Sequence, residues 1–284
     1  MHGMHARLPK GFVLEERLER YADIIEVCPR HLRGDWARAC HPLPFGDPGA
    51  SADELPRYRE VRLDLGCGKG AFVIESARRE PDVLFVGVDG EPYCIARAAQ
   101  YATEAGVRNA VFAPGVGMAV TSFFAPGELA RIHLNFSTPY PRKRDAARRL
   151  TSVEHLMAYR DVLAPGGTVS FRTDSLPFRE FTLTQLALAG YEVTWRSDDA
   201  RAERPEAPVT EYEERLCAQG ATVYAIDAVP GPRPESWEQT ASLSLVDYLP
   251  SDLEGMGYVP YGMEASVRNL RNLERKGRSR GEAR

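Results

Sequence analysis

The stretch Asp64-Leu65-Gly66-Cys67-Gly68-Lys69-Gly70 is the strongest indication of the fold class, because it places a glycine-rich turn between a predicted strand and a predicted helix. Glycines let the backbone turn tightly and lie close to a ligand, and the following helix offers free N–H groups at the positive end of its dipole. A second predicted strand ends at Asp89, 23 positions after Gly66, where a carboxylate can accept the hydroxyls of an adenosine ribose. The order of these features predicts a nucleotide-binding, doubly wound fold.

The glycine turn alone does not determine which nucleotide cofactor binds. Gly66-x-Gly68-x-x-Ala71 also satisfies the loose dinucleotide pattern. On this turn alone, NAD therefore stays open as an alternative to other adenosine-containing cofactors.

Strands and helices alternate from Val61 onward, which indicates a parallel sheet covered on both faces. The five expected parallel strands are Val61–Leu65, Val83–Val88, Ala110–Ala113, Arg131–Asn135 and Thr168–Arg172. Gly190–Arg196 and Thr222–Ile226 follow without a full crossover helix between them, so we expect them to pair antiparallel. This ending is more typical of a methyltransferase sheet than of a dehydrogenase.

The regions before and after this alternating pattern differ from it in composition. We expect a helical and loop extension over 1–60, the main domain over 61–228, and a proline-rich linker with a C-terminal extension over 229–284. In the first extension a short amphipathic helix is predicted from Glu15 to Val27, and the linker is predicted to start at Val229. The tyrosines and other apolar residues of the last segment give it enough surface to pack on the rest of the protein.

Charge and cysteine content limit the classes of function. The net charge of −4 means that binding of nucleic acid requires a local basic patch rather than a global field. One such patch is the tail from Arg268 to Arg284, with seven basic and two acidic residues, which is interpreted either as a solvated, partly disordered end or as an RNA-contacting arm.

The five cysteines are scattered without a Cys-x-x-Cys pair, which fits a reducing cytoplasm. No long apolar run marks a signal peptide or membrane span, so a cytoplasmic location without membrane attachment is expected. The spacing of one mixed group fits no usual zinc pattern, and we expect no metal. That group is Cys28, His31, Cys40 and His41.

A basic loop follows the fourth expected strand. It reads Phe136-Ser137-Thr138-Pro139-Tyr140-Pro141-Arg142-Lys143-Arg144, with Arg148-Arg149 behind it. Ligands of open α/β sheets bind outside the carboxyl ends of the strands, where this loop is expected. The prolines stiffen it, an aromatic ring can stack on a base, and five basic residues can neutralise phosphates. The alternative is a solvated basic loop with no ligand.

A third informative stretch is Thr210-Glu211-Tyr212-Glu213-Glu214-Arg215, which precedes the last expected strand. A carboxylate beside a hydroxyl can accept the two parallel N–H donors on the Watson–Crick edge of guanine. The same hexapeptide is also an ordinary helix start, with Thr210 as N-cap and Glu213 at the capping-box position. The two interpretations can hold together.

In this order, the three stretches resemble the bacterial tRNA (guanine-N7)-methyltransferase family, which modifies guanine 46 in the tRNA variable loop. The resemblance extends roughly from Tyr21 to Ala228 and includes Phe171-Arg172-Thr173-Asp174. It implies the Rossmann-like α/β fold of class I S-adenosylmethionine-dependent methyltransferases, tRNA as the partner, and S-adenosylhomocysteine as the second product. A monomer and a homodimer are both compatible with it.

The resemblance also implies the site residues. The cofactor would be held by Asp64, Gly66, Gly68, Asp89 and the chain around Val116. The substrate would be held by Arg142, Asp174, Thr210, Glu211, Tyr212 and Glu213, and the catalytic positions would be Thr138 and Asp174.

The sequence departs from the family pattern where Phe-Pro-Asp-Pro-Trp-Pro is usual. Within this motif Thr138 replaces the key aspartate. A few residues later Asp145 replaces the usual histidine and Ala147 replaces a basic residue. After the third strand Val116 replaces the usual acid. Guanine N7 attacks with an in-plane lone pair and needs no general base, so losing one preorganised carboxylate is expected to slow transfer roughly a hundredfold rather than abolish it. The alternatives are a relative that binds tRNA without methylating it, and a small-molecule methyltransferase or nucleotide-dependent oxidoreductase on the same sheet.

Overall fold

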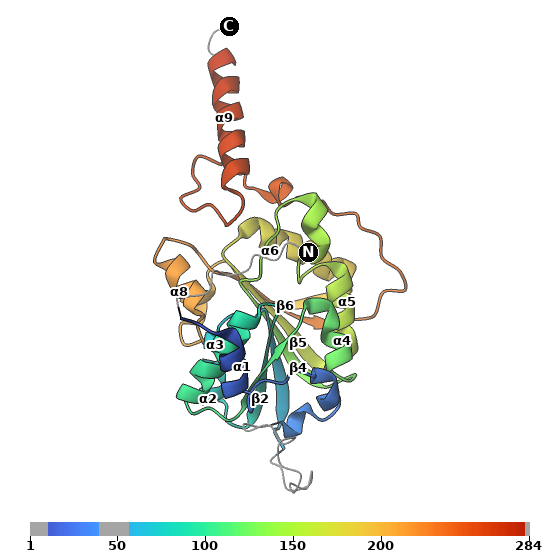
Figure 1. The fold of residues 1–284 in the computed structure, drawn as a ribbon. Helices are drawn as coiled ribbons and strands as arrows, with labels where there is room; N and C mark the ends of the chain where they lie inside the picture. Colours follow the sequence, from blue (N-terminus) through green and yellow to red (C-terminus); the bar gives the residue numbers. More distant parts are fainter. Residues whose placement is uncertain (1–10, 40–56, 282–284) are drawn as a thin grey trace, which may run out of the picture. The chain divides into compact units, whose positions relative to one another are not determined.

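Residues 11–39 and 57–281 are described by the computed structural model, and their strands form a seven-stranded sheet in the order β3-β2-β1-β4-β5-β7-β6 (Figure 1). The strands are β1 (Glu60–Leu65), β2 (Val83–Asp89), β3 (Ala110–Pro114), β4 (Leu129–Asn135), β5 (Leu163–Thr173), β6 (Tyr191–Ser197) and β7 (Tyr224–Pro230). Each expected strand is therefore confirmed. The largest differences lie in β5, which starts earlier, and in β7, which ends later.

Strand pairing confirms the expected α/β fold class. β1 pairs in parallel with both β2 and β4, and β2 pairs in parallel with β3. The chain order reverses on either side of β1, and the carboxyl ends of strands at such a switch point are where open α/β sheets bind ligands. β6 and β7 pair antiparallel, with Tyr191 opposite Pro230, as expected from the lack of a full crossover helix between them.

The chain divides into two compact units. Unit 1 contains 1–135, 157–170 and 206–211, and unit 2 contains 136–156, 171–205 and 212–284. In unit 1, α1 (Leu14–Arg20), α2 (Ala71–Arg79) and α3 (Pro92–Glu104) lie together beside β2 in Figure 1. The apolar faces of α2, α3, β2 and β3 and the residues just after α1 form one buried cluster, which includes Ile24, Val73, Phe85, Ala99 and Phe112.

The first helix is shorter than predicted, because the residues after it pair with the sheet. α1 ends at Arg20 rather than at Val27. Phe112 N–H of β3 donates to Ile24 O at 3.0 Å, and Glu26 N–H donates to Phe112 O at 2.8 Å. This extended pairing gives the backbone of Ile24 and Glu26 hydrogen-bond partners in β3, and Ile24 is completely buried. A helix continued through Ile24 could not form these bonds with β3.

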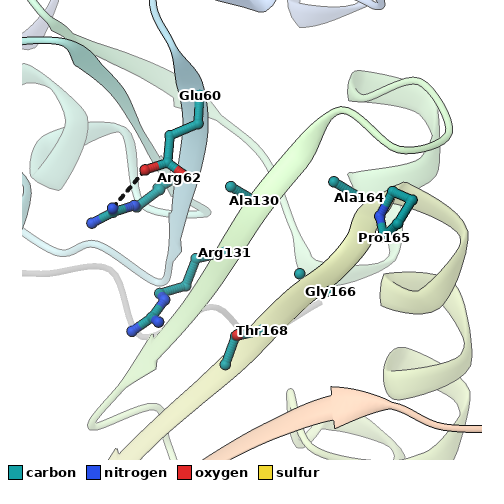
Figure 2. Close-up of a pocket in the computed structure, with 9 residues that line it drawn as sticks. Glu60, Arg62, Ala130, Arg131, Ala164, Pro165, Gly166 and Thr168 are labelled. Atoms are coloured by element: carbon teal, nitrogen blue, oxygen red, sulfur yellow. Dashed lines mark hydrogen bonds and ion pairs between the residues drawn. The ribbon is translucent and has the colours of Figure 1, made fainter.

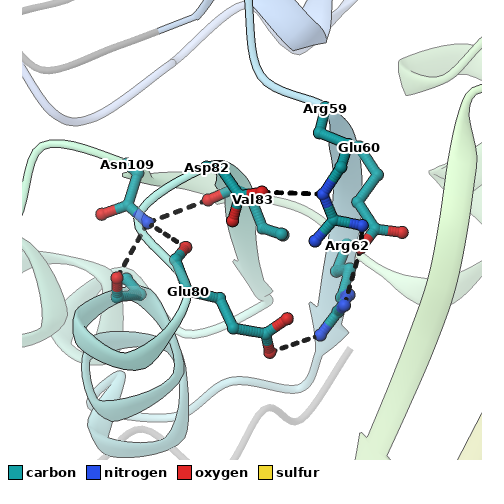
Figure 3. A network of polar contacts seen from close by, with 8 residues as sticks. Arg59, Glu60, Arg62, Glu80, Asp82, Val83 and Asn109 are labelled. Carbon is teal, nitrogen blue, oxygen red and sulfur yellow. Dashed lines mark hydrogen bonds and ion pairs between the residues drawn. The ribbon is translucent and has the colours of Figure 1, made fainter.

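Polar contacts join β1 to the end of α2 near the amino ends of β1 and β2 (Figure 3). Arg62 of β1 donates to Glu60 at 2.7 Å and to Glu80 at 2.6 Å. The side-chain amide of Asn109 donates to three main-chain carbonyl oxygens at 2.9 to 3.0 Å, those of Ala77, Glu80 and Val83. Asn109 thereby satisfies carbonyl groups that the end of α2 leaves without helical partners.

Unit 2 contains most of the remaining helices. They are α6 (Leu176–Leu188), α7 (Ala200–Glu203), α9 (Glu264–Gly281), the 3₁₀ helices η5 (Lys143–Arg148) and η6 (Leu245–Tyr248), and α8 (Glu211–Cys217) except its first residue. The short α4 (Val120–Phe123) lies in unit 1, and α5 (Val153–Val162) contributes to both. Phe171 and Phe178 pack edge to face in unit 2, with ring centroids 5.0 Å apart.

Two expectations for the C-terminal region need correction. β7 runs through Pro230, so Val229 and Pro230 are strand residues rather than linker. Arg268 to Gly281 are helical within α9, whereas a partly disordered tail was one of the two interpretations. The buried Val267 and the contacts of Arg271 with the carbonyl oxygens of Leu253 and Met256 explain the helix, because they pack one side of its first half against unit 2.

Candidate cofactor and substrate sites

The glycine turn is fixed to the end of β2 by main-chain hydrogen bonds. Gly66 N–H donates to Val88 O at 2.7 Å, and Cys67 N–H donates to the same oxygen at 3.1 Å. Gly70 has φ +79°, and a Cβ on it would lie 2.8 Å from the Cβ of Ala98 on α3. Only glycine meets both demands, so this residue lets α2 start directly against α3.

Asp89 organises the same turn from the last position of β2. Its Oδ2 accepts from Gly68 N–H at 2.9 Å, and its Oδ1 accepts from Glu91 N–H at 2.8 Å. Burial raises the pKa of Asp89, against the opposing effect of these hydrogen bonds. Each carboxylate oxygen keeps acceptor capacity beyond these bonds, which suits the paired hydroxyls of a ribose.

Asp64 is a second acid of this region and is buried at the end of β1. Its side chain is 2% exposed and accepts from Asn135 Nδ2 at 3.1 Å. The pKa of Asp64 is raised to about 7, mainly by burial; the Asn135 hydrogen bond opposes this shift and the nearby charge of Asp89 adds to it. A ligand cation placed here would relieve the cost of two negative charges lying close together, one of them buried.

This electrostatic arrangement distinguishes the two classes of cofactor that the turn leaves open. The ammonium and sulfonium groups of S-adenosylmethionine are cations, which the buried carboxylate of Asp64 and the half-buried one of Asp89 stabilise. The pyrophosphate of a dinucleotide is an anion, which Asp64 would repel. The residues of the turn therefore fit S-adenosylmethionine.

Val116 lies in the loop after β3, beside Asp89. Gly115 N–H donates to Asp89 O at 3.0 Å, which joins this loop to the end of β2. The Val116 side chain is 65% exposed, and Met118 nearby is also exposed. Unit 1 thus brings together the five residues expected to hold the cofactor: Asp64, Gly66, Gly68, Asp89 and Val116.

A cavity of about 260 Å³ in unit 1 lies elsewhere, near the amino ends of β1, β4 and β5 (Figure 2). Its polar lining includes Arg62, Arg131 and Thr168, together with the glycines at 166 and 167. None of the residues expected to hold the cofactor or the substrate lines it. The candidate cofactor site is therefore the turn at the carboxyl ends of the strands and not this cavity.

The basic loop in unit 2 has an unusual backbone. Phe136 and Tyr140 have φ of +49° and +42°, in the left-handed region that non-glycine residues rarely adopt. They flank the segment that contains Thr138, whose side chain is half-buried. Strained residues of this kind persist only where surrounding contacts hold them, and they concentrate at functional sites.

Arg149 supplies those contacts. Its buried guanidinium donates from Nε to Pro139 O at 2.9 Å and from Nη2 to Tyr140 O at 2.6 Å, and it lies over the ring of Phe181. Burial lowers the pKa of Arg149 to about 10, so the group remains charged at neutral pH. The expectation that Arg149 neutralises phosphate is therefore wrong, because its charge is committed to main-chain carbonyls inside the protein.

The other basic residues of the loop are exposed: Arg142, Lys143, Arg144 and Arg148. Arg148 lies over the ring of Tyr140 with its Cζ 4.2 Å from the centroid. Asp145, which takes the position of the family's histidine, lies 3.8 Å from Arg144 and 3.9 Å from Arg148. Exposed ion pairs of this length are weak and leave the arginines able to contact phosphate.

Asp174 lies in the short turn between β5 and α6, where the side chain of Ser175 caps the helix by accepting from Phe178 N–H at 3.3 Å. The Asp174 side chain is buried and accepts a hydrogen bond from the hydroxyl of Tyr258. The sequence marked Tyr258 only as apolar surface for packing. No local motif identifies it, because its partner is 84 residues away.

The hexapeptide 210–215, which is predicted to contact guanine, is divided between the units: Thr210 and Glu211 belong to unit 1, and Tyr212 and Glu213 to unit 2. α8 begins at Glu211, directly after Thr210. Within unit 2 the ring of Tyr212 packs against Phe136 of the basic loop, with centroids 5.8 Å apart. These two predicted substrate stretches therefore meet at an aromatic contact.

Glu213 is fully buried between two arginines. Its carboxylate lies 3.6 Å from Arg172 Nη1 and 3.5 Å from Arg201 Nε. In unit 1 Glu211 pairs instead with Lys69 of the glycine turn, at 3.3 Å. Contact of either carboxylate with guanine stays a prediction.

Two negative findings apply to the described residues. No group of three or more His, Cys, Asp or Glu side chains in 11–39 and 57–281 has an arrangement suited to a metal ion, while Cys40 and His41 of the suspected zinc group lie outside these ranges. In the same part of the chain, no helix combines the length and the apolar content that crossing a membrane requires.

Comparison with known proteins adds independent information. Residues 58–226 match a family model described as a putative methyltransferase. A tRNA (guanine-N(7)-)-methyltransferase of Lactiplantibacillus plantarum is 35% identical over 211 residues, which are 73% of this chain and 91% of that protein. The enzyme of the same name from Geobacillus kaustophilus is 36% identical over 223 residues, 78% of this chain and 96% of that protein.

Proposed function

The chain belongs to the tRNA (guanine-N(7)-)-methyltransferase family, and from this premise we propose that it methylates N7 of guanine 46 in the tRNA variable loop. The observation that carries the proposal is the pair of carboxylates around the glycine turn, the buried Asp64 and the half-buried Asp89, whose pKa values burial raises. This pair favours a cationic, ribose-containing cofactor over a dinucleotide.

S-adenosylmethionine supplies an electrophilic methyl group on a positively charged sulfur. We assign its amino group to Asp64, its ribose hydroxyls to Asp89, and its close approach to the backbone to Gly66 and Gly68. Val116 replaces an acid of the family, but its main-chain N–H is a donor that side-chain replacement does not remove. The exposed apolar side chain of Val116 also gives the adenine ring a surface to pack on.

On the substrate side, Arg142 and its exposed neighbours bind phosphate, and Asp174 contacts the guanine base. Thr210 through Glu213 select guanine by its Watson–Crick edge. Tyr212 contributes an aromatic face, and the ion pairs of Glu213 with Arg172 and Arg201 fix the helix that carries it. Guanine N7 has no proton to lose, so the protein's main task is to align N7 with the methyl carbon and sulfur.

Thr138 occupies the position where the family has an aspartate, and this substitution sets the expected rate. A carboxylate there would offset the positive charge that develops on the purine, whereas a hydroxyl offers only a dipole. We therefore propose an active enzyme that is slower than its relatives. Asp174, which is buried in the same unit, is the acid that we assign to supply part of the missing negative charge.

The decisive experiment is methyl transfer from labelled S-adenosylmethionine to unmodified tRNA transcripts, followed by chain cleavage specific for N7-methylguanosine. A cut at position 46 is expected, and a transcript with adenine at that position serves as the control. Transfer at another guanine would contradict the proposed position. Binding of tRNA without any transfer would support the alternative of a non-methylating relative.

The role of Thr138 is tested by Thr138→Asp, with Thr138→Asn as a control of similar shape without charge. We expect Thr138→Asp to raise kcat by about tenfold to a hundredfold, because it restores a preorganised opposite charge. Thr138→Asn is expected to leave kcat nearly unchanged. Equal effects of the two variants would show that charge at this position does not limit the rate.

A further inference from the structure

The segment after β7 lies beyond the family match, which ends at residue 226, yet it contacts the substrate side of unit 2. Leu245 N–H donates to Pro141 O of the basic loop at 3.0 Å. Arg149, which holds that loop, also donates from Nη2 to Leu243 O at 2.9 Å. One buried guanidinium therefore fixes both the loop and the C-terminal segment.

Apolar contacts anchor the same segment. Its side chains of Leu245, Leu253, Met263 and Val267 are buried. The ring of Tyr248 packs edge to face against Phe181 of α6, with centroids 6.2 Å apart. The C-terminal segment is thus a packed part of unit 2 rather than a free tail.

The turn that carries Tyr258 is held on its other side by α9. Arg271 of α9 donates from Nε to Leu253 O at 2.8 Å and from Nη2 to Met256 O at 3.0 Å. These two hydrogen bonds hold the backbone just before Tyr258 to α9.

Tyr258 uses its hydroxyl to hold the Asp174 carboxylate. The hydroxyl donates to Asp174 Oδ2, and among the described residues no other side chain donates to this carboxylate. Burial raises the pKa of Tyr258, and the hydrogen bond to Asp174 raises it further, so the phenol stays protonated and remains a donor. The second carboxylate oxygen keeps its lone pairs for another donor.

We propose that Tyr258 is a positioning residue of the methyl transfer, which orients Asp174 so that Oδ1 accepts an N–H of the guanine base. This inference rests on the proposed function. A carboxylate that is held in one rotamer before the RNA binds loses less conformational freedom on binding. The C-terminal segment thereby takes part in substrate recognition from outside the family match.

The test compares Tyr258→Phe with wild-type enzyme in the full-length protein. Removal of one hydrogen bond to a carboxylate is expected to lower kcat/KM for tRNA by about tenfold. The KM for S-adenosylmethionine is expected to stay unchanged, because the cofactor residues belong to unit 1. Tyr261→Phe is the matched control, since Tyr261 is an exposed tyrosine three residues away, and it is expected to behave as wild type.

A double-mutant cycle with Asp174→Asn separates positioning from general packing. If Tyr258 acts through Asp174, the double variant is no slower than Asp174→Asn alone. Additive losses, or a Tyr258→Phe enzyme within twofold of wild type, would overturn the inference. An equal loss in Tyr261→Phe would overturn it as well, because the effect would then belong to the segment as a whole.

The methyl-transfer activity of the wild-type enzyme separates a failure of this inference from a failure of the proposed function. Wild-type protein that transfers no methyl group to tRNA contradicts the proposed function and removes the role of Tyr258 with it. Active wild-type protein with an unaffected Tyr258→Phe variant contradicts only the role of Tyr258.

Discussion

The glycine turn of unit 1 and the basic loop of unit 2 are built in different ways. The turn is closed by partners close in sequence: Gly68 bonds to Asp89, 21 residues away. The loop is closed by Arg149 together with Leu243, 94 residues farther along the chain. The turn is also the part with the family's glycines and acids, whereas the loop is where Thr138 departs from the family.

This difference indicates that the glycine turn is held by contacts between residues close in sequence, whereas the basic loop is held by contacts with a distant segment. A local motif tolerates changes elsewhere in the chain, because its geometry needs few distant contacts. A loop held by distant carbonyl groups depends on the segment that supplies them. Variants in the two regions should therefore fail in different assays.

The largest effect is expected from Asp89→Ala. Two main-chain donors of the turn lose their acceptor, and the ribose loses its carboxylate, so the Kd for S-adenosylhomocysteine should rise by about a hundredfold or more. Isothermal titration calorimetry measures this. The control is Asp82→Ala, which removes an exposed carboxylate near the other end of β2. A change below about fivefold in Asp89→Ala would contradict the assignment of Asp89 to the cofactor.

A large effect on folding is expected from Gly70→Ala. The new Cβ would meet Ala98 at 2.8 Å and impose the strain of φ +79°, so the free energy of unfolding should fall by about 2 to 4 kcal/mol. Gly106→Ala is the matched control, because Gly106 has φ +70° with nothing within 4 Å of the added Cβ. It should lose only about 1 to 2 kcal/mol in urea denaturation. Equal losses would mean that the contact with Ala98 is not tight.

Unit 1 shows why the sequence predicts its strands and glycine turn correctly, while the assignment of its acids to a cofactor stays a prediction. Its strands, the turn at Gly66 and the acid at Asp89 form a repeating local pattern, and each element can be read without knowing the others. The extent of the first helix was wrong, because burial of Ile24 against β3 overrides helical periodicity. That override depends on a strand more than 80 residues away, which no local window contains.

The substrate half shows the limit of such predictions. The sequence identifies the loop around Thr138 and the acid Asp174 through family resemblance. It counts Arg149 as a phosphate ligand, whereas the structure commits that guanidinium to the carbonyls of the loop. An arginine beside other arginines looks the same in sequence whether it points outward or inward. Tyr258 carries no signal either, because a tyrosine in an apolar segment predicts only packing.

A pH titration sharpens the comparison through Asp64. Its pKa is about 7 in the folded protein and near 3.8 when unfolded, so between these values the folded state binds more protons. Stability without cofactor should therefore fall as pH rises through this window, by up to about 1.4 kcal/mol per pH unit. Urea denaturation from pH 4 to pH 8 measures the slope.

Asp64→Asn is the control for this titration. It removes the titrating group, so the slope of stability against pH should flatten. In wild type the affinity for S-adenosylmethionine should rise as Asp64 ionises above pH 7, and in the variant this rise should also flatten. An unchanged slope in the variant would assign the titration to other groups.

The smallest effect is expected from the ion pair between Lys69 and Glu211, which within unit 1 joins the glycine turn to the stretch that we propose contacts guanine. Both side chains are more than one-third exposed and lie 3.3 Å apart, so water and salt screen the pair. A cycle of Lys69→Met, Glu211→Gln and the double variant should give a coupling below about 1 kcal/mol in unfolding. The cofactor Kd should change less than about threefold. A larger coupling would mean that the turn is not purely local, because the stretch before Tyr212 would then help to form it.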